Sequence, residues 1–313
     1  MLRFYMKNQS NATVKKSVTL SFQGLPLETQ AALWAFLGVL SFSLTLPLTR
    51  IAAPLMGGFT VGSGRAILAG LLAGLLLYIR REHLPDRKHW RGLALVAFGC
   101  IFGFPILSSL ALQFVDSSHG SVINGLLPAA TAVAAVIFTK ERPHYGFWIV
   151  CAVGVLAAIL YGLSRGAGSL QLGDLLMLAA VCLGAIGYAE GGRLAREIEG
   201  WRVISWALIF ALPLQFLIFP FALSSHSFNP TALAWLCFLY VAVFSQFIGF
   251  FAWYKGLAMG SIAKTGQVQL AQTPLTLLWS GLLLGEILDP VTLAAGGFMV
   301  LVAILSRFTR VKR

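Results

Sequence analysis

The chain has 313 residues, of which 58% are hydrophobic and 11% are charged, and its formal net charge is +12. A soluble domain carries about 25% charged residues, so this composition excludes an ordinary soluble globular protein and indicates a chain embedded in lipid. The sequence contains no Gly-x-x-x-x-Gly-Lys-Ser/Thr motif, so nothing in it indicates transport driven by ATP.

The first 29 residues are polar and include the basic pair Lys15 and Lys16. A cleaved signal peptide would carry its apolar region earlier, followed by a cleavage site of small residues. Residues 1–29 are therefore expected to form a loose cytoplasmic tail before a first span that is retained.

Ten apolar runs follow, each near the length of about 20 residues that a helix needs to cross about 30 Å of hydrocarbon. Strands of a membrane barrel would be about half as long and would alternate, and none of these runs alternates. We therefore predict an all-α membrane protein with ten transmembrane helices. In chain order, the expected spans are 30–49, 60–79, 91–112, 118–138, 145–163, 174–192, 202–222, 231–254, 262–284 and 288–306.

Basic residues gather on one side of the predicted bundle. With the N-terminus inside, only Arg50, Arg65 and Arg165 of the 23 Lys and Arg residues fall outside. Membrane proteins concentrate Lys and Arg in cytoplasmic loops, so both termini are expected in the cytoplasm. This distribution accounts for the positive charge, and no nucleic-acid partner is needed to explain it.

Four cysteines, Cys100, Cys151, Cys182 and Cys237, fall within the predicted spans. They have neither the paired extracytoplasmic spacing of disulfides nor the spacing of a metal site. We expect them to act as small buried apolar side chains. The sequence predicts no metal site and no cofactor.

Two stretches, 145 residues apart, share a polar start, an apolar run broken by proline, and a glutamate. The first runs from Asp116 to Glu141 and the second from Ser261 to Glu286. This spacing indicates an internal repeat, which in a membrane protein places a substrate site between the two copies. Its matched pairs are Asn124 with Gln269, Thr131 with Thr276, and Glu141 with Glu286.

The repeat predicts two membrane-embedded halves. We expect the first at 30–163, with helices 1 to 5, and the second at 174–308, with helices 6 to 10. Because five crossings are an odd number, the second half must enter the bilayer from the opposite side. The loop after span 4 is basic, with Lys140 and Arg142, whereas its counterpart after span 9 has no basic residue, as inversion predicts.

Several of these features occur together in one group of membrane proteins. They are the segments from Pro128 to Glu141 and from Pro274 to Glu286, the runs 111–114 and 256–259 before them, and Arg65 in span 2. On these features the chain resembles, over residues 30–308, the drug/metabolite transporter superfamily and its EamA-type families. The resemblance implies a multi-pass carrier of the bacterial inner (plasma) membrane, commonly an exporter of amino acids or other small metabolites. The prolines depart by one position, because Pro128 aligns with Thr273.

Polar side chains within the spans mark the expected substrate site, since polar groups in hydrocarbon usually face a cavity or another helix. At 100° per residue, the polar positions of span 4 fall on one face, and span 9 repeats this stripe. Two inverted stripes would line opposite walls of a central cavity, and the alternative is hydrogen bonding between packed helices. The stripes consist of Ser117, Ser121, Asn124 and Thr131 in span 4, and of Gly266, Gln269, Thr273 and Thr276 in span 9.

Other spans offer further cavity candidates. Gln267 and Gln272 add two amides to span 9, and at least one of them is expected to face the cavity. Tyr188 of span 6 pairs with Thr45 of span 1 in the repeat, and both could face the cavity. Spans 3 and 8 suit either a small-molecule pocket or lipid and interface contacts. Their candidates are Phe98, Phe102, Phe104, Ser108 and Gln113 in span 3, and Tyr240, Ser245, Gln246, Phe250, Trp253 and Tyr254 in span 8.

Two titratable side chains are candidates for proton coupling. Glu190 lies near the cytoplasmic end of span 6, where a carboxylate partly out of water binds protons more tightly. It could accept a coupling proton or pair with Arg193, one turn away. His119 begins span 4 on the outer side, titrates near neutrality and has Asp116 beside it to tune it.

Three further charged residues are expected to be architectural. Arg65 is expected to make a structural pair or a headgroup contact, and the alternative is that it attracts anionic groups at the outer mouth. Glu141 and Glu286 each precede the last span of a half, where a glutamate can cap free N–H groups at a helix start.

These features predict a secondary carrier whose two halves rock about a central cavity by alternating access. A passive facilitator or a lipid flippase of the same fold is the alternative. A membrane enzyme is disfavoured, because the chain has no Gly-x-Ser-x-Gly and no paired His-Glu metal motif, and Ser121 and His119 face apart on a helix. The expected partners are a small-molecule metabolite and the lipid bilayer, without nucleic acid, and the chain is expected to be a monomer or a weak homodimer.

Overall fold

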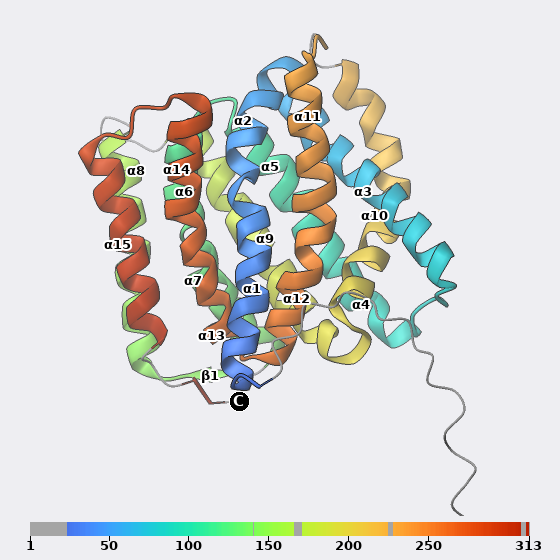
Figure 1. The fold of residues 1–313 in the computed structure, drawn as a ribbon, viewed down its shortest axis with the longest axis horizontal. Helices are drawn as coiled ribbons and strands as arrows, with labels where there is room; N and C mark the ends of the chain where they lie inside the picture. The colour runs from blue at the N-terminus through green and yellow to red at the C-terminus, as the bar shows by residue number, and fades with distance from the viewer. Residues whose placement is uncertain (1–23, 140, 166–170, 225–227, 308–310, 313) are drawn as a thin grey trace, which may run out of the picture.

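The computed structural model describes residues 24–139, 141–165, 171–224, 228–307 and 311–312. Most of the predicted tail at 1–29, and Lys140, therefore lie outside the described residues. The described chain is helical apart from a pair of two-residue strands, in which β1 (Arg142–Pro143) runs antiparallel to β2 (Val311–Lys312). The start of α1 (Leu27–Ser43) and β2 lie at the same end of the bundle (Figure 1).

The helices follow the apolar runs of the sequence. The first predicted half contains α1, α2 (Thr45–Met56), α3 (Gly58–Arg80), α4 (Arg87–Val96), η1 (Ala97–Gly103), α5 (Phe104–Ala111), α6 (Ser117–Asn124), α7 (Leu127–Thr139) and α8 (Tyr145–Arg165). The second contains α9 (Leu172–Ile198), α10 (Gly200–Ser224), α11 (Ala232–Tyr240), η2 (Val241–Ile248), α12 (Gly249–Met259), α13 (Ile262–Gly266), η3 (Gln267–Ala271), α14 (Gln272–Leu284) and α15 (Pro290–Arg307). Some elements, such as α4, η1 and α5, continue one another as a single rod.

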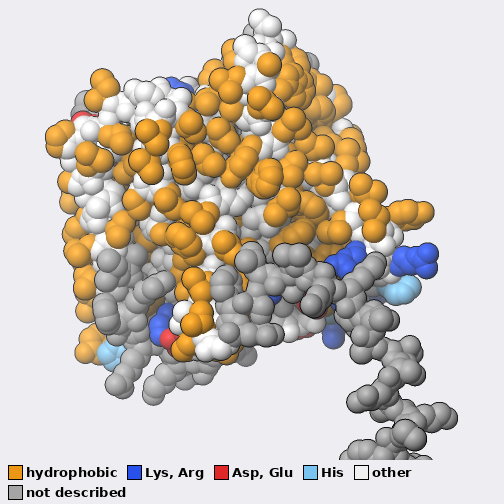
Figure 2. All heavy atoms as spheres, in the orientation of Figure 1, with side chains coloured by type: hydrophobic (Ala, Val, Ile, Leu, Met, Phe, Trp, Pro, Cys, Tyr) orange, Lys and Arg blue, Asp and Glu red, His pale blue; other side chains and the backbone are white. Residues whose placement is uncertain are grey.

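Within the described ranges, seven helices or rods are long and apolar enough to cross a membrane. They are Leu27–Met56, Gly58–Arg80, Arg87–Ala111, Ser117–Thr139, Leu172–Ile198, Gly200–Leu223 and Ala232–Met259. Tyr145–Tyr161 of α8 and Pro290–Val302 of α15 are shorter apolar helices. Figure 2 shows hydrophobic side chains over most of the visible face, and most of the visible Lys and Arg side chains near its lower end. The chain is a multi-pass membrane protein, and the count of ten spans stays a prediction.

Two of the rods contain a π-helical segment, in which hydrogen bonds reach one residue further than in an α-helix. The segment η1 lies between α4 and α5, and η2 lies between α11 and α12. They begin at Ala97 and Val241, 144 residues apart, which is close to the spacing of the sequence repeat. Such segments often occur at functional sites.

Long helices pack in pairs, with α1 along α12, α3 along α10, α7 along α9 and α8 along α15 (Figure 1). Small residues permit the closest of these approaches. A Cβ atom added at Gly256 of α12 would come within 2.6 Å of the backbone nitrogen of Ala35 in α1. Lipid gives helices little hydrophobic reason to associate, so close packing of this kind stabilises the bundle.

The rod α6–α7 runs antiparallel to the rod formed by α13, η3 and α14. Glu141, which follows α7, accepts hydrogen bonds from the backbone N–H groups of Ile262 and Ala263 at the start of α13, at 2.9 and 3.0 Å. Gly285, with a φ of 65°, ends α14 and turns the chain at Glu286. Glu286 then accepts bonds from two backbone N–H groups at the start of α6, at 3.0 and 2.9 Å. Each glutamate therefore caps a helix of the other predicted half, whereas the sequence led us to expect a cap on the last helix of its own half.

Candidate functional site

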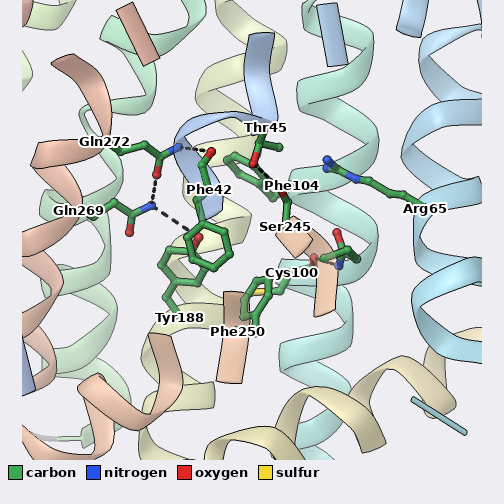
Figure 3. Close-up of a pocket in the computed structure, with 11 residues that line it drawn as sticks. Phe42, Thr45, Arg65, Cys100, Phe104, Tyr188, Ser245, Phe250, Gln269 and Gln272 are labelled. Carbon is green, nitrogen blue, oxygen red and sulfur yellow. Dashed lines mark hydrogen bonds between the residues drawn. The ribbon is translucent and has the colours of Figure 1, made fainter. Parts of the chain in front are cut away.

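An internal cavity lies among α1, α2, α3, α5, α9, α12, η3, α14 and the two π-helical segments (Figure 3). Its cavity volume is about 30 Å³, which is room for one or two water molecules. Its walls combine aromatic rings, amides, small polar groups and one arginine. The described residues that line it are Phe42, Thr45, Arg65, Cys100, Phe104, Tyr188, Ser245, Gln246, Phe250, Gln269 and Gln272.

Two amides line one wall, Gln269 from η3 and Gln272 from α14. Side chains three residues apart lie one above the other in a 3₁₀ helix such as η3, which places these two on the same face. Gln269 Nε2 donates to Gln272 Oε1 at 3.2 Å and to the Tyr188 hydroxyl at 3.5 Å. Gln272 Nε2 donates to the Phe42 carbonyl at 3.3 Å. Gln269 Oε1 has no hydrogen-bond partner among the described residues, so this wall retains a free acceptor.

The two π-helical segments meet at the cavity. Gln246 Nε2 of η2 donates to the Cys100 carbonyl of η1 at 2.9 Å. Ser245, also in η2, accepts a hydrogen bond from the Thr45 hydroxyl of α2 at 2.9 Å. These bonds join the two predicted halves at the site.

Aromatic rings form another wall. The ring centroids of Phe42 and Phe250 lie 5.1 Å apart, and Tyr188 lies 5.9 Å from Phe250 and 5.1 Å from Trp253. Tilted and edge-on contacts at these distances are favourable for aromatic pairs. Trp253 and Tyr254 are fully buried in the core. Their burial contradicts the alternative of interfacial anchoring that the sequence left open for them.

Arg65 of α3 reaches the cavity from the side opposite Gln269 and Gln272 (Figure 3). It is 1% exposed, and its Nε atom has no hydrogen-bond partner in the described part of the chain. None of the ion pairs formed by the described residues includes it. The structure therefore corrects the expected headgroup contact or structural pair, because α3 packs against α10 and η2 and places Arg65 inside the bundle.

Several residues of the predicted stripe join helices and do not line this cavity. The Ser121 hydroxyl donates to the Thr273 carbonyl at 3.4 Å, and the Thr273 hydroxyl donates to the Ser121 carbonyl at 3.5 Å. Thr276 donates its hydroxyl to the Ser43 carbonyl at 2.8 Å. This is the alternative of helix–helix hydrogen bonding that the sequence allowed.

Four more predicted residues also lie outside the lining. Asn124 and Thr131 are buried, and neither Asn124 Oδ1 nor Thr131 Oγ1 has a hydrogen-bond partner in the described part of the chain. Gln267 Nε2 donates to the carbonyl of Ala263, four residues back, at 3.4 Å. Phe102 is half-buried and packs against the main hydrophobic core.

The predicted stripe does not form one continuous cavity wall, because the helices that carry it are interrupted. Residues 125–126 separate α6 from α7, and the 3₁₀ segment η3 interrupts span 9 between α13 and α14. A rotation of 100° per residue applies only within an unbroken α-helix. The register of 100° per residue therefore does not carry across these two breaks.

Glu190, the first coupling candidate, lies outside the cavity lining. It is buried, and Arg193 donates to its two carboxylate oxygens at 2.7 and 2.9 Å. This is the ion pair that the sequence offered as the alternative to a proton-accepting role.

His119, the second coupling candidate, also lies outside the lining and is buried. Its Nε2 atom lies 2.5 Å from Asp174 Oδ1, and its ring centroid lies 5.4 Å from that of Tyr161. Asp116, which was expected to tune it, instead forms an ion pair with Arg50 at 3.1 Å. The carboxylate beside His119 therefore comes from α9.

Phe42 and Cys100 line the cavity although the sequence did not single them out for it. Phe42 is an apolar residue in an apolar span and gives no signal. Cys100 does give a sequence signal, because it aligns at the spacing of 145 with Ser245, which is a candidate for the cavity. Of the other cysteines, Cys151 and Cys237 are buried as expected, whereas Cys182 is exposed.

The model of the EamA-like transporter family matches the chain twice, at residues 29–163 and 171–308. The uncharacterized transporter YdeK of Bacillus subtilis (strain 168) is 45% identical over 252 residues, which cover 80% of this chain and 88% of YdeK. An S-adenosylmethionine/S-adenosylhomocysteine transporter of Chlamydia muridarum is 25% identical over 91% of this chain and 93% of its own length. A probable terminal-alkyne amino-acid exporter of Streptantibioticus cattleyicolor is 23% identical over 86% and 91%, respectively.

A solved structure described as "Crystal structure of protein" is similar to this fold, with a TM-score of 0.68. The match covers 89% of this chain and 98% of that chain, at 17% sequence identity. At this identity the likeness shows a shared fold and carries nothing about substrate.

Proposed function

This chain belongs to the EamA-like transporter family, and we propose that it is a secondary carrier that exports a small metabolite across the bacterial inner membrane. The relatives described above are named as transporters or exporters. The observation that carries the proposal is the internal cavity, because its polar side chains come from both predicted halves. A site shared by two halves is what an alternating-access carrier requires.

The proposed architecture consists of ten spans in two inverted halves, 30–163 and 174–308. The family model matches one segment in each half. Inversion is further supported by the antiparallel rods that Glu141 and Glu286 join, and by the matched segments η1 and η2. The distribution of basic residues supports cytoplasmic positions for both termini.

Alternating access requires a closure on each side of the cavity. We assign these closures to the two capping glutamates, Glu141 with the start of α13 and Glu286 with the start of α6. In the proposed topology, Glu141 lies at the cytoplasmic end and Glu286 at the outer end. Transport would release one cap while the other stays formed.

The cavity is better suited to binding than to catalysis. A nucleophile such as Thr45 or Cys100 would need a general base within hydrogen-bond reach. The described residues that line the cavity include no His, Lys, Asp or Glu to act as that base. The site therefore supports a carrier, and we do not assign it an enzymatic activity.

The proposed substrate is an amino acid or a metabolite that contains an amino-acid group. Two of the relatives are named for such compounds, S-adenosylmethionine with S-adenosylhomocysteine, and a terminal-alkyne amino acid. A mixed wall of amides and aromatic rings can bind both the polar and the apolar parts of such molecules.

The cavity assignment is tested by uptake into proteoliposomes that contain the purified chain. Labelled amino acids, S-adenosylmethionine, nucleosides and sugars serve as substrates. We expect Gln269→Leu to reduce uptake of the accepted compound by about 10-fold or more, because it removes an amide from the wall. Asn124→Leu is the matched control, since Asn124 is the repeat partner of Gln269 and lies outside the lining. Equal loss in both variants, or loss in neither, would remove Gln269 from the site.

Proton coupling is tested in the same vesicles with an imposed pH gradient. We propose His119 as the coupling residue in preference to Glu190, because Arg193 already neutralises Glu190. The groups that face His119 are Asp174 and Tyr161. His119→Gln should abolish the effect of the gradient on uptake while uptake down a substrate gradient persists. If the variant responds to the gradient like the unaltered chain, His119 is not the coupling group, and if the unaltered chain shows no response, transport is not coupled to protons.

A further inference from the structure

Arg65 differs from the other buried charged residues in lacking a partner within the described chain. The buried carboxylates all have one. Their pairs are Glu141 with Arg196, Asp174 with His119, and Glu190 with Arg193. Arg65 is as deeply buried as these, but its Nε atom donates no hydrogen bond and none of the ion pairs among the described residues includes it.

An unpaired guanidinium in this position is unfavourable by itself. An arginine side chain stays protonated in proteins, so it cannot relieve its burial by losing the proton. A charge removed from water is stabilised only when an opposite charge and hydrogen-bond acceptors replace the water. Since the described chain does not supply them, the compensating anion is expected to come from a bound molecule.

The geometry of the cavity agrees with this expectation. The side chain of Arg65 points from α3 toward Thr45 and Phe104, on the side of the cavity opposite Gln269 (Figure 3). None of the described lining residues carries a negative charge. The planar fork of a guanidinium matches the two oxygens of a carboxylate and binds them with parallel hydrogen bonds.

We propose that Arg65 binds the anionic group, a carboxylate or a group of similar chemistry, of the molecule that this protein transports. The inference rests on the proposed carrier function and narrows its substrate class. The substrate carries an anionic group at the Arg65 side, and its apolar or aromatic part contacts Phe42, Tyr188 and Phe250 across the cavity. A cation without an anionic group is not a substrate.

The first test uses the unaltered full chain in proteoliposomes. Uptake of labelled S-adenosylmethionine and of labelled propargylglycine, a terminal-alkyne amino acid, is measured with three unlabelled competitors. The competitors are an amino acid, its carboxamide and its phosphonate analogue. We expect the amino acid and the phosphonate to inhibit, and the carboxamide to be about 10-fold weaker or more, because it is neutral where Arg65 requires an anion. A carboxamide that inhibits as well as the acid would overturn the inference.

The second test compares three variants of matched size. Arg65→Met removes the charge and should reduce uptake by about 100-fold, whereas Arg65→Lys keeps a charge without the planar fork and should lose less. Arg50→Met is the control, since Arg50 lies outside the cavity lining and pairs with Asp116, and it should stay near the level of the unaltered chain. Should Arg65→Met fail to fold, the competitor series on the unaltered chain decides.

A failure of the proposed carrier function and a failure of the Arg65 assignment give different experimental results. If the unaltered chain takes up neither labelled compound nor any other small metabolite, the proposed function is wrong and the inference falls with it. If uptake is present but Arg65→Met, correctly folded, retains it, only the assignment of Arg65 is wrong.

Discussion

The two ends of the antiparallel rods are closed by the same type of side chain in different surroundings. At one end, Glu141 is 2% exposed, caps α13, pairs with Arg196 at 3.3 Å and accepts the Ser261 hydroxyl at 2.9 Å. At the other end, Glu286 is half-buried and caps α6 with two hydrogen bonds, and none of the ion pairs among the described residues includes it. A glutamate therefore caps a helix at both ends, but the two caps differ in burial and in the number of partners.

This inequality has a consequence for transport. A buried carboxylate with a cation and several donors is harder to release than a half-buried carboxylate with two donors. We therefore expect the Glu286 end to open more easily than the Glu141 end. In the proposed topology, the empty carrier then opens more readily to the outside.

Removing the Glu141 carboxylate should have the largest effect. Glu141→Ala leaves the N–H groups of Ile262 and Ala263 and the charge of Arg196 without their acceptor. We expect the free energy of unfolding to fall by about 3 kcal/mol, measured by denaturant titration in detergent micelles. Glu28→Ala is the control, because it removes an exposed carboxylate that pairs with Lys264, and it should cost about 0.5 kcal/mol or less.

Removing the Glu286 carboxylate should have a smaller effect. Glu286→Ala takes away the cap of α6 but leaves no unpaired cation, so we expect a loss of about 1.5 kcal/mol in the same titration. Glu286→Gln retains one acceptor oxygen and should recover part of this loss. If the Glu286→Ala variant is less stable than the Glu141→Ala variant, the Glu286 closure is the stronger one, contrary to our expectation.

Removing the cation at the Glu141 end should have the smallest effect on stability. It should also make the two ends more similar, because neither glutamate would then have an ion-pair partner among the described residues. Arg196→Met breaks the ion pair with Glu141 and a hydrogen bond to the Gly260 carbonyl, but Glu141 still caps α13. Arg196 is partly exposed, and the buried Glu141 carboxylate keeps two backbone N–H donors and the Ser261 hydroxyl, so we expect a loss of about 1 kcal/mol. The further loss on adding Glu141→Ala to Arg196→Met should be smaller than the loss from Glu141→Ala alone, because the variant no longer leaves a cation unpaired. Strict additivity of the two changes would show that the ion pair contributes nothing.

The sequence located the helices well and their internal breaks poorly. The span predicted at 60–79 is α3 (Gly58–Arg80), and that at 174–192 lies within α9 (Leu172–Ile198). The π-helical segment η2 contains neither Gly nor Pro, so no local residue pattern marks it. Such breaks arise from packing between helices, which the order of residues along one helix does not reveal.

Part of the candidate site could likewise be predicted from the sequence, and part of it could not. Gln246, Gln269 and Gln272 were recognisable as amides within apolar spans, and all three line the cavity. The stripe through Asn124 and Thr131 was misplaced, because its register depends on the break between α6 and α7. Arg65 could not be assigned from the sequence, since the absence of a partner is a property of the whole packed bundle.

The capping pattern was predictable only in part. A glutamate beside a helix start indicates a cap, and both Glu141 and Glu286 do cap helices. The helix that each one caps belongs to the opposite predicted half, and its start lies 121 residues from Glu141 and 169 residues from Glu286. That pairing depends on how the two halves dock, which a single sequence read along its length does not contain.

We propose that the cavity opens in turn through these two unequal closures, and Cys100 provides a native reporter because it lines the cavity. Replacing Cys151, Cys182 and Cys237 with alanine leaves Cys100 as the one thiol, in a variant first shown to retain uptake. A membrane-impermeant maleimide is then applied to oriented vesicles from one side or the other. We expect Glu141→Ala to increase labelling of Cys100 from the cytoplasmic side and Glu286→Ala to increase it from the outer side. Labelling that neither variant changes, or that both increase from the same side, would contradict this proposal.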